Sequence, residues 1–263
     1  MGDPFRRSAG AWTALVLLFL DLPVFVLVAW SFNDSRLNVA WGGFTVRWYA
    51  AAWADGGLVR ALANSLRVAA WTTLLAVLLG TGAALALGRW RFRGARALET
   101  MLLLPMIAPE VVIGASLLAL FAAIGLELGF VTVIVSHVTF CLPFVAVAVR
   151  ARLASLDPAL EEAALDLGAT PAVALRRVVL PLLAPAILAG ALMAFALSLD
   201  ELVVTWFTAG AGSRTLPLEV YARVRRGLDP GLNAVSTVLV AASVLLVVAT
   251  GALGGRRAPG ARR

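Results

Sequence analysis

Long apolar runs are the feature that most limits how this chain can fold. Six runs made up mostly of Ala, Val, Leu, Ile, Phe and Gly cover residues 9–30, 61–87, 98–124, 130–149, 182–207 and 233–253. Runs of about twenty such residues cross a bilayer as helices, because a helix satisfies its own backbone hydrogen bonds there. The sequence therefore predicts an all-α membrane protein with six transmembrane helices in a single domain, residues 1–263.

Local signals refine these spans. The first run is too long for a signal peptide and lacks a small-residue cleavage site, so we expect it to remain as a span. Pro105 and Pro109 should kink or break the third span. Residues 31–60 are polar and rich in aromatic side chains, a composition typical of the headgroup region. The Gly-, Pro- and Arg-rich tail, about 254–263, is expected to be disordered.

The arginines give the orientation. Six spans place both termini on one side of the membrane, and on that side lie fourteen of the 22 basic residues. Cytoplasmic loops carry an excess of basic residues. Both termini and the polar segment 150–181 are therefore predicted to be cytoplasmic.

Composition excludes several classes of function. All 22 basic residues are arginine, so a Walker A lysine and a lysine Schiff base are both impossible. The net charge of +7 does not indicate nucleic-acid binding, because the arginines cluster at the ends of spans. One cysteine (Cys141) and one histidine (His137) exclude a disulfide framework and a Cys/His metal cluster. No cofactor or metal is expected, and both residues are expected to have structural roles.

The segment 157–181 lies between two apolar runs but is itself polar. Asp157-Pro158 is typical of a helix start, with a capping carboxylate followed by proline. Gly168 should stop that helix, since glycine accepts positive φ. Thr170-Pro171 should cap a second short helix, which we expect Pro181 to end. The segment is thus predicted to form a rigid two-helix loop at one membrane face.

The first helix of this loop is expected to be amphipathic. Glu161 and Glu162 lie near its N-terminus, where the helix dipole favours negative charge. A narrow apolar stripe runs along one side, formed by Leu156, Leu160, Ala163, Ala164 and Leu167.

The spacing within this loop resembles the EAA loop of ABC importer permeases. Glu162-Ala163-Ala164 is followed after three residues by Gly168 and after nine more by Val178-Val179-Leu180-Pro181, with Val178 in place of the family's isoleucine. The resemblance implies a coupling loop that docks on a cytoplasmic ATPase through Glu162, Ala163, Ala164, Gly168, Val178, Leu180 and Pro181. The alternative is an amphipathic linker that merely joins two spans.

Four carboxylates fall inside the predicted spans: Asp21, Glu110, Asp200 and Glu201. Each costs at least ~2.5–3.5 kcal/mol near the bilayer centre, so such groups usually face a bundle interior or a water-filled cavity. Neighbours on a helix point about 100° apart, which favours Asp200 over Glu201 for a substrate path. No arginine lies at matching depth, so the path suits a cation, and Trp206 would add a cation–π contact. Alternatively, these carboxylates are protonated structural groups or contact a partner subunit.

Beyond the loop, an ordered set of short stretches resembles the second permease of spermidine/putrescine importers. The stretches are Ser31-Phe32-Asn33, Trp41, Gly43-Phe44-Thr45, Trp48-Tyr49, Asn64-Ser65, residues 106–112, residues 198–204, Thr215-Leu216-Pro217, Tyr221 and Asn233-Ala234. The resemblance implies a type I ABC importer transmembrane domain in the bacterial inner membrane, without a catalytic residue of its own. It also implies three partners: a second permease forming a heterodimer, an ATP-binding cassette ATPase dimer and an extracytoplasmic substrate-binding protein.

Three other functions fit parts of the sequence. Related permeases carry other small solutes, so the substrate is less firmly indicated than the family. A proton-coupled secondary cation transporter would also use intramembrane carboxylates, although the sequence lacks the internal repeats common in such proteins. An intramembrane serine protease would need Ser116 and His137, but Ser116 lacks the following glycine of a nucleophile motif.

Overall fold

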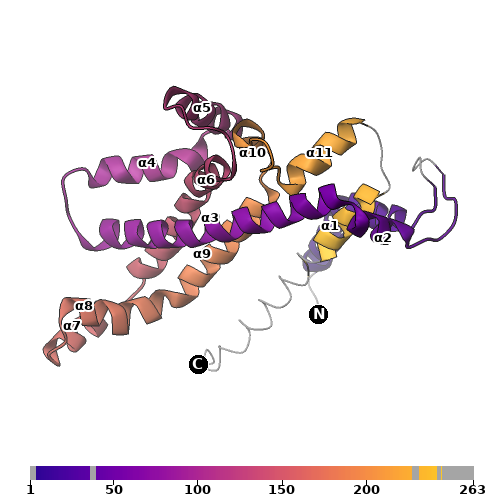
Figure 1. Cartoon of the computed structure of the whole chain (residues 1–263). Helices are drawn as coiled ribbons and strands as arrows, with labels where there is room; N and C mark the ends of the chain where they lie inside the picture. Colours follow the sequence, from indigo (N-terminus) through magenta and orange to yellow (C-terminus); the bar gives the residue numbers. More distant parts are fainter. Residues whose placement is uncertain (1–3, 36–39, 227–230, 242–243, 245–263) are drawn as a thin grey trace. The chain divides into compact units, whose positions relative to one another are not determined.

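The computed structural model describes residues 4–35, 40–226, 231–241 and 244, and these residues are mainly helical (Figure 1). The elements are α1 (Pro4–Trp30), α2 (Arg47–Ala54), α3 (Gly56–Arg89), α4 (Ala95–Ile107), α5 (Glu110–Ala123), α6 (Phe130–Ala154), α7 (Ala159–Asp166), α8 (Pro171–Ala174), the π-helical turn η1 (Leu175–Val179), α9 (Leu180–Asp200), α10 (Val203–Thr208) and α11 (Leu216–Arg226). Within the described residues, β pairing is limited to an isolated bridge between Asn33 and Phe44. The predicted all-α class is confirmed.

Four helices are long and apolar enough to cross a membrane: Trp12–Trp30 of α1, α3, α6, and the helix Pro171–Asp200 that α8, η1 and α9 form together. The pair α4 and α5 makes a fifth candidate, bent by 118° between Ile107 and Glu110. The predicted break of this span thus occurs at Pro109, whereas Pro105 lies inside α4. The helix Gly231–Ala241 begins the predicted sixth span. Most of the rest of that span, and the tail 254–263, lie outside the described residues.

The chain folds into two compact units. The terminal unit comprises Met1–Val59 and Val220–Arg263, and the central unit comprises Arg60–Glu219. The central unit therefore contains most of α3 and all of α4 to α10.

The core of the central unit lies between α3, α6 and α9. Glycines allow close packing around Val145 of α6: a Cβ at Gly80 would lie 3.0 Å from its Cβ, and one at Gly190 would lie 3.3 Å from its Cα. Small residues of this kind let membrane helices approach closely. The buried side chains of this core are Ala76, Ala84, Phe140, Cys141, Val145, Val149, Val179, Leu183 and Ala194.

In the terminal unit, Asn33 organises the segment between α1 and α2. Its side chain accepts a hydrogen bond from the Gly42 N–H (2.7 Å) and donates one to the Ala40 carbonyl (3.0 Å). The Trp48 indole N–H donates to the Asn33 carbonyl at 2.8 Å. Trp53 remains 73% exposed, so an aromatic surface is available for the predicted headgroup contact.

One sequence expectation about the loop is wrong: Pro181 does not end a helix. The helix is continuous from Pro171 to Asp200. In the π-helical turn that precedes the proline, the Leu180 N–H donates to the Leu175 carbonyl. A π adjustment of this kind lets a membrane helix absorb the missing N–H of a proline.

Candidate functional site

The two-helix loop has the geometry that its sequence predicts up to Thr170. The Asp157 carboxylate accepts a hydrogen bond from the Ala159 N–H (3.0 Å) at the start of α7. Gly168 ends the helix with φ of +89°. The Gly168 N–H donates to the Leu165 carbonyl and the Ala169 N–H to the Ala164 carbonyl, a Schellman arrangement. Thr170 then caps α8 by accepting from the Val173 N–H at 3.4 Å.

Although the loop is polar overall, it exposes several leucine side chains. Leu167 is 90% exposed, and Leu160 and Leu165 are also exposed. Glu162, Ala163 and Gly168 share this exposed surface, and Ala164 is half-buried. Clusters of exposed apolar side chains mark contact sites for other proteins. The stripe predicted from sequence is therefore divided, because Leu156 packs partly against the core of the central unit.

The remaining residues of the EAA pattern lie where the loop joins the span. Val178 belongs to η1, and Leu180 and Pro181 form the first turn of α9. Val178 and Leu180 are half-buried, whereas Pro181 is exposed. These three residues therefore connect the exposed loop to α9 without an intervening hinge.

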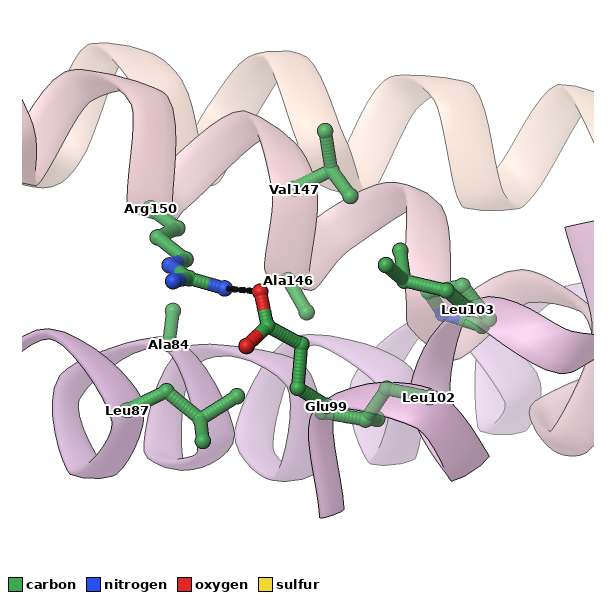
Figure 2. Close-up of a pocket in the computed structure, with 9 residues that line it drawn as sticks. Ala84, Leu87, Glu99, Leu102, Leu103, Ala146, Val147 and Arg150 are labelled. Atoms are coloured by element: carbon green, nitrogen blue, oxygen red, sulfur yellow. Dashed lines mark hydrogen bonds and ion pairs between the residues drawn. The ribbon is translucent and has the colours of Figure 1, made fainter. Parts of the chain in front are cut away.

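Two ion pairs lie near the two-helix loop in the central unit. Arg89, in the last turn of α3, pairs with Glu161 in the first turn of α7. Figure 2 shows the second pair, in which Arg150 of α6 faces Glu99 of α4. The crevice beside this second pair is lined mostly by apolar side chains of α3, α4 and α6 and holds about 20 Å³, roughly the space of one water.

Three of the four predicted carboxylates come together at the breaks between helices. Glu110 begins α5, and Asp200 ends α9; both are exposed. Helix α10 packs on α5, where Phe207 lies so close to Gly114 that an added Cβ would be 2.5 Å from its ring. Both Glu110 and Asp200 are near enough to Glu201 to interact with it electrostatically. Asp21 belongs to the terminal unit, where it is exposed on α1.

Glu201 has a different environment from its neighbour Asp200. It is 5% exposed, and its carboxylate accepts a hydrogen bond from the Val204 N–H at 2.8 Å. Glu201 therefore caps α10. The helical angle expected between the two residues does not apply, because Glu201 lies after the end of α9 in extended backbone; the two carboxylates differ instead in burial, with Asp200 exposed. Trp206 of the same short helix is 48% exposed.

His137 connects three helices through a buried hydrogen-bond chain. Its Nδ1 lies 2.8 Å from Ser198 Oγ of α9, and its Nε2 lies 2.8 Å from Thr205 Oγ1 of α10. The Thr205 hydroxyl donates to the Glu201 carbonyl, so it accepts from Nε2–H, and the neutral ring then accepts from Ser198 at Nδ1. This hydrogen-bond network was not predicted from the sequence. No local spacing indicates it, because Ser198 and Thr205 lie in different helices on either side of the break at Glu201 and Leu202.

The hydrogen bonds of His137 also test the alternative of an intramembrane serine protease. Both ring nitrogens of His137 are engaged, and Ser116 is exposed on α5 with neither of them as its partner. Ser116 therefore has no general base from His137 in this structure.

A larger groove lies beside α3, α4 and α6 but does not contain the carboxylates. It holds about 420 Å³ and is lined almost entirely by apolar side chains such as Leu79, Met101 and Val138. Glu110 and Asp200 instead face outward from the central unit. A path along them would thus need a further surface to enclose it.

Comparisons with known proteins agree on one kind of protein. Residues 76–262 match the family described as "Binding-protein-dependent transport system inner membrane component". The chain is similar to the "Spermidine/putrescine transport system permease protein PotC" of Escherichia coli (strain K12), with 40% identity over 93% of each chain. It is also similar to the "Putrescine transport system permease protein PotI" of the same organism, with 42% identity over 91% of this chain and 88% of the other. The "Molybdenum transport system permease protein ModB" of Mycobacterium bovis is 37% identical over 73% of this chain and 78% of its own length.

Solved structures share the fold. A bacterial ABC transporter that imports the acidic polysaccharide alginate superposes with a TM-score of 0.70 at 17% identity, covering 98% of this chain and 99% of the other. An amino acid ABC transporter with histidines gives a TM-score of 0.62 at 19% identity, covering 82% of this chain and 100% of the other.

Proposed function

This chain belongs to the family of binding-protein-dependent transport system inner membrane components, and on that basis we propose that it forms half of the translocation path of an ATP-driven polyamine importer. It is a multi-pass inner-membrane protein and a transport component rather than an enzyme. The importer would carry spermidine, putrescine or a similar organic cation, because the relatives PotC and PotI are named for spermidine and putrescine transport. We treat residues 1–263 as one permease domain.

The outward-facing carboxylates are the observation that carries this proposal. Glu110 and Asp200 are exposed, and the ion pairs found within the described residues do not involve either of them. A lone carboxylate facing lipid near the bilayer centre costs at least about 2.5–3.5 kcal/mol. A second, similar permease that covers this surface would enclose a water-filled path, and so we infer a heterodimer.

This path would favour cations. Unpaired carboxylates attract an ammonium group, and the exposed ring of Trp206 adds a cation–π surface on the same short helix that Glu201 caps. Asp200 is the residue we place in the path first. Glu110 follows it, whereas Glu201 acts mainly through the cap. We include Asp21 in the path solely because it lies within the predicted span of α1.

The exposed two-helix loop would receive the ATPase. Glu162, Ala163 and Gly168 lie on its exposed surface, where Leu167 supplies an apolar side chain for docking. Val178, Leu180 and Pro181 join the loop to α9 through continuous helix, so a displacement of the loop moves the span directly. Closure of the ATPase dimer on ATP would thereby open the path outward. Both termini and the loop would be cytoplasmic, and a soluble binding protein would deliver the substrate from the other side.

Uptake by reconstituted proteoliposomes tests the substrate and the path. We expect Asp200→Asn to lower ATP-driven putrescine or spermidine uptake about tenfold, equivalent to about 1.4 kcal/mol, while the ATPase still binds. Glu127→Gln, an exposed carboxylate in the loop between α5 and α6, serves as the matched control with normal uptake. Loss of ATPase binding with unchanged uptake per assembled complex would place Asp200 outside the path.

The same vesicles separate the alternatives. A proton-coupled transporter would take up polyamine without ATP and would stop when the proton gradient is dissipated. The importer needs ATP and the binding protein and tolerates the loss of the gradient. A permease of this family with another substrate would show ATP-driven uptake of a different solute, which competition by unlabelled candidates identifies.

A further inference from the structure

The ion pair between Arg89 and Glu161 joins the two-helix loop to a membrane span that is distant in sequence. The loop is attached by the chain itself to α6 and to α9. Arg89 ends α3, which is not connected to the loop by any short stretch of chain. Among the ion pairs of the described residues, this pair is the one that reaches α7 from a transmembrane helix.

Local physical chemistry favours both charges where they stand. Arg89 lies in the last turn of α3, where the helix dipole stabilises a cation. Glu161 lies in the first turn of α7, where the dipole stabilises an anion. The pair therefore joins the negative end of α3 to the positive end of α7. The helix dipoles and the side-chain charges both favour this contact.

The pair is also shielded from water. The side chains of Arg89 and Glu161 are 20% and 26% exposed. The neighbouring arginines Arg91, Arg93 and Arg96 are exposed, and the ion pairs of the described residues do not include them. The Nη1 atom of Arg89 is buried without a hydrogen bond in the described part of the chain. Moving α7 away would leave this half-buried cation without its counter-charge, and this loss opposes separation of the two helices.

Packing continues from this pair into the core. A Cβ on Gly88, beside Arg89, would lie 2.6 Å from a methyl group of Leu153 on α6. Leu153 and Leu156 both pack against the core that α3, α6 and α9 share. A displacement of α7 through Glu161 would therefore reach α3 and this core directly.

We propose that Arg89 and Glu161 are positioning residues that make α3 move together with the coupling loop, so that ATP-driven displacement of the loop reaches two spans, α9 through the chain and α3 through the ion pair. This inference rests on the proposed function of the loop. The pair lies beside Glu162 of the EAA pattern but has a different role, because Glu162 docks the ATPase whereas Glu161 holds the loop on α3.

Charge reversal in the assembled transporter tests the pair. We expect Arg89→Glu and Glu161→Arg each to leave ATPase docking and ATP hydrolysis in place while lowering uptake per ATP by about fivefold or more, the lower end of ordinary coupling between sites. The double variant Arg89→Glu/Glu161→Arg should recover part of that loss, because it restores attraction although it opposes both helix dipoles. Arg93→Glu makes the same charge change at an exposed arginine without a partner among the described residues and should keep the normal ratio.

The outcomes separate this inference from the proposed function. Glu162→Arg should instead abolish docking, and docking that survives it counts against the coupling role of the loop and not against the pair. The inference about the pair would be overturned if uptake per ATP in the double variant were no higher than in the worse single variant. It would also be overturned if Arg93→Glu lowered uptake per ATP equally. So would a loss of assembled complex with uptake per ATP unchanged, which is the result of a merely structural role.

A second measurement uses the purified chain alone and does not depend on transport. Hydrogen–deuterium exchange of residues 159–166 should quicken in Arg89→Glu, remain normal in Arg93→Glu and return toward normal in the double variant. Equal exchange in all four proteins would show that the pair does not hold α7.

Discussion

At the scale of single residues, two glycines of the central unit differ sharply in their surroundings. A Cβ on Gly210 would lie 1.7 Å from the backbone oxygen of Leu128, whereas one on Gly82 would meet nothing within 4 Å. The first glycine lets the segment after α10 approach the start of α6. The second is an ordinary helical position on the exposed side of α3.

These surroundings predict opposite effects of the same substitution. Gly210→Ala forces two backbones apart and should destabilise the protein by about 1–3 kcal/mol or more. Gly82→Ala should be neutral or should stabilise the helix by roughly 0.5–1 kcal/mol. Thermal unfolding of the two purified variants in the same detergent measures the difference. Equal melting temperatures would mean that the close approach at Gly210 does not exist.

The buried chain through His137 explains how residues shape the acidic site without facing it. Ser198, His137 and Thr205 hold α9 and α10 on α6, and Thr205 donates to the carbonyl of Glu201. Glu201 in turn caps α10. Hydrogen-bonded groups therefore lie on both sides of the break that follows Asp200.

At the scale of elements, the turn at Gly168 decides whether α7 and α8 form a compact loop. We expect Gly168→Val to insert in the membrane normally but to uncouple transport from ATP hydrolysis, because a β-branched residue resists positive φ. Gly168→Asn is the matched control, since asparagine tolerates the left-handed region, and it should retain most of the coupling. The measurement is uptake per ATP in reconstituted transporter. Normal uptake per ATP in the valine variant would show that the turn at Gly168 is not needed for coupling.

A second element contact ties α11 to the start of α3 in the terminal unit. Arg223 donates two hydrogen bonds to the Asp55 carboxylate, at 2.7 and 3.1 Å, while that carboxylate also accepts from the N–H groups of Gly57 and Leu58. The hydrogen bond from Arg223 is the largest cause that lowers the pKa of Asp55 from 3.8 to about 2. The carboxylate is therefore both a helix cap and a partner of α11.

This contact predicts a defined pH dependence. Because the folded pKa is depressed, the stabilisation by Asp55 is fully present above its ordinary value of 3.8 and is lost as pH falls through about 2. Thermal unfolding across that range should show Asp55→Asn less stable than the native chain above about pH 4, with the two converging near about pH 2. A difference between them that stays constant over the whole range would contradict the pair.

At the scale of the whole molecule, labelling of introduced cysteines can test the proposed orientation, because the chain has a single native cysteine. Cys141 is fully buried, so it should not react with a membrane-impermeant maleimide in the folded protein. We expect Trp53→Cys to label from outside intact cells and Leu167→Cys to label only after the membrane is opened. Both positions are highly exposed, at 73% and 90%, so accessibility alone does not separate them. The reverse labelling pattern would place the two-helix loop outside.

Much of the fold follows from local sequence signals. The lengths of the apolar runs predicted helices where α1, α3, α6 and α9 lie, and Pro109 predicted the break between α4 and α5. The capping residues Asp157 and Thr170 and the turn at Gly168 are local features, so the two-helix loop could be predicted before its surroundings were known. The expectation for Pro181 was wrong because this proline lies inside a continuous helix, Pro171–Asp200, and the π-helical turn that accommodates it cannot be located from local sequence rules.

By itself, the sequence determined the helices, their caps and the loop that resembles a coupling element, since each depends on residues within a few turns of one another. Only the tertiary structure decided which carboxylate is exposed and which caps a helix, what holds His137, and which of the clustered arginines has a partner. The physical reason is distance along the chain. Arg89 and Glu161, like His137 and Thr205, meet only after the helices have packed, and neither the charge of a side chain nor its local spacing says what lies opposite.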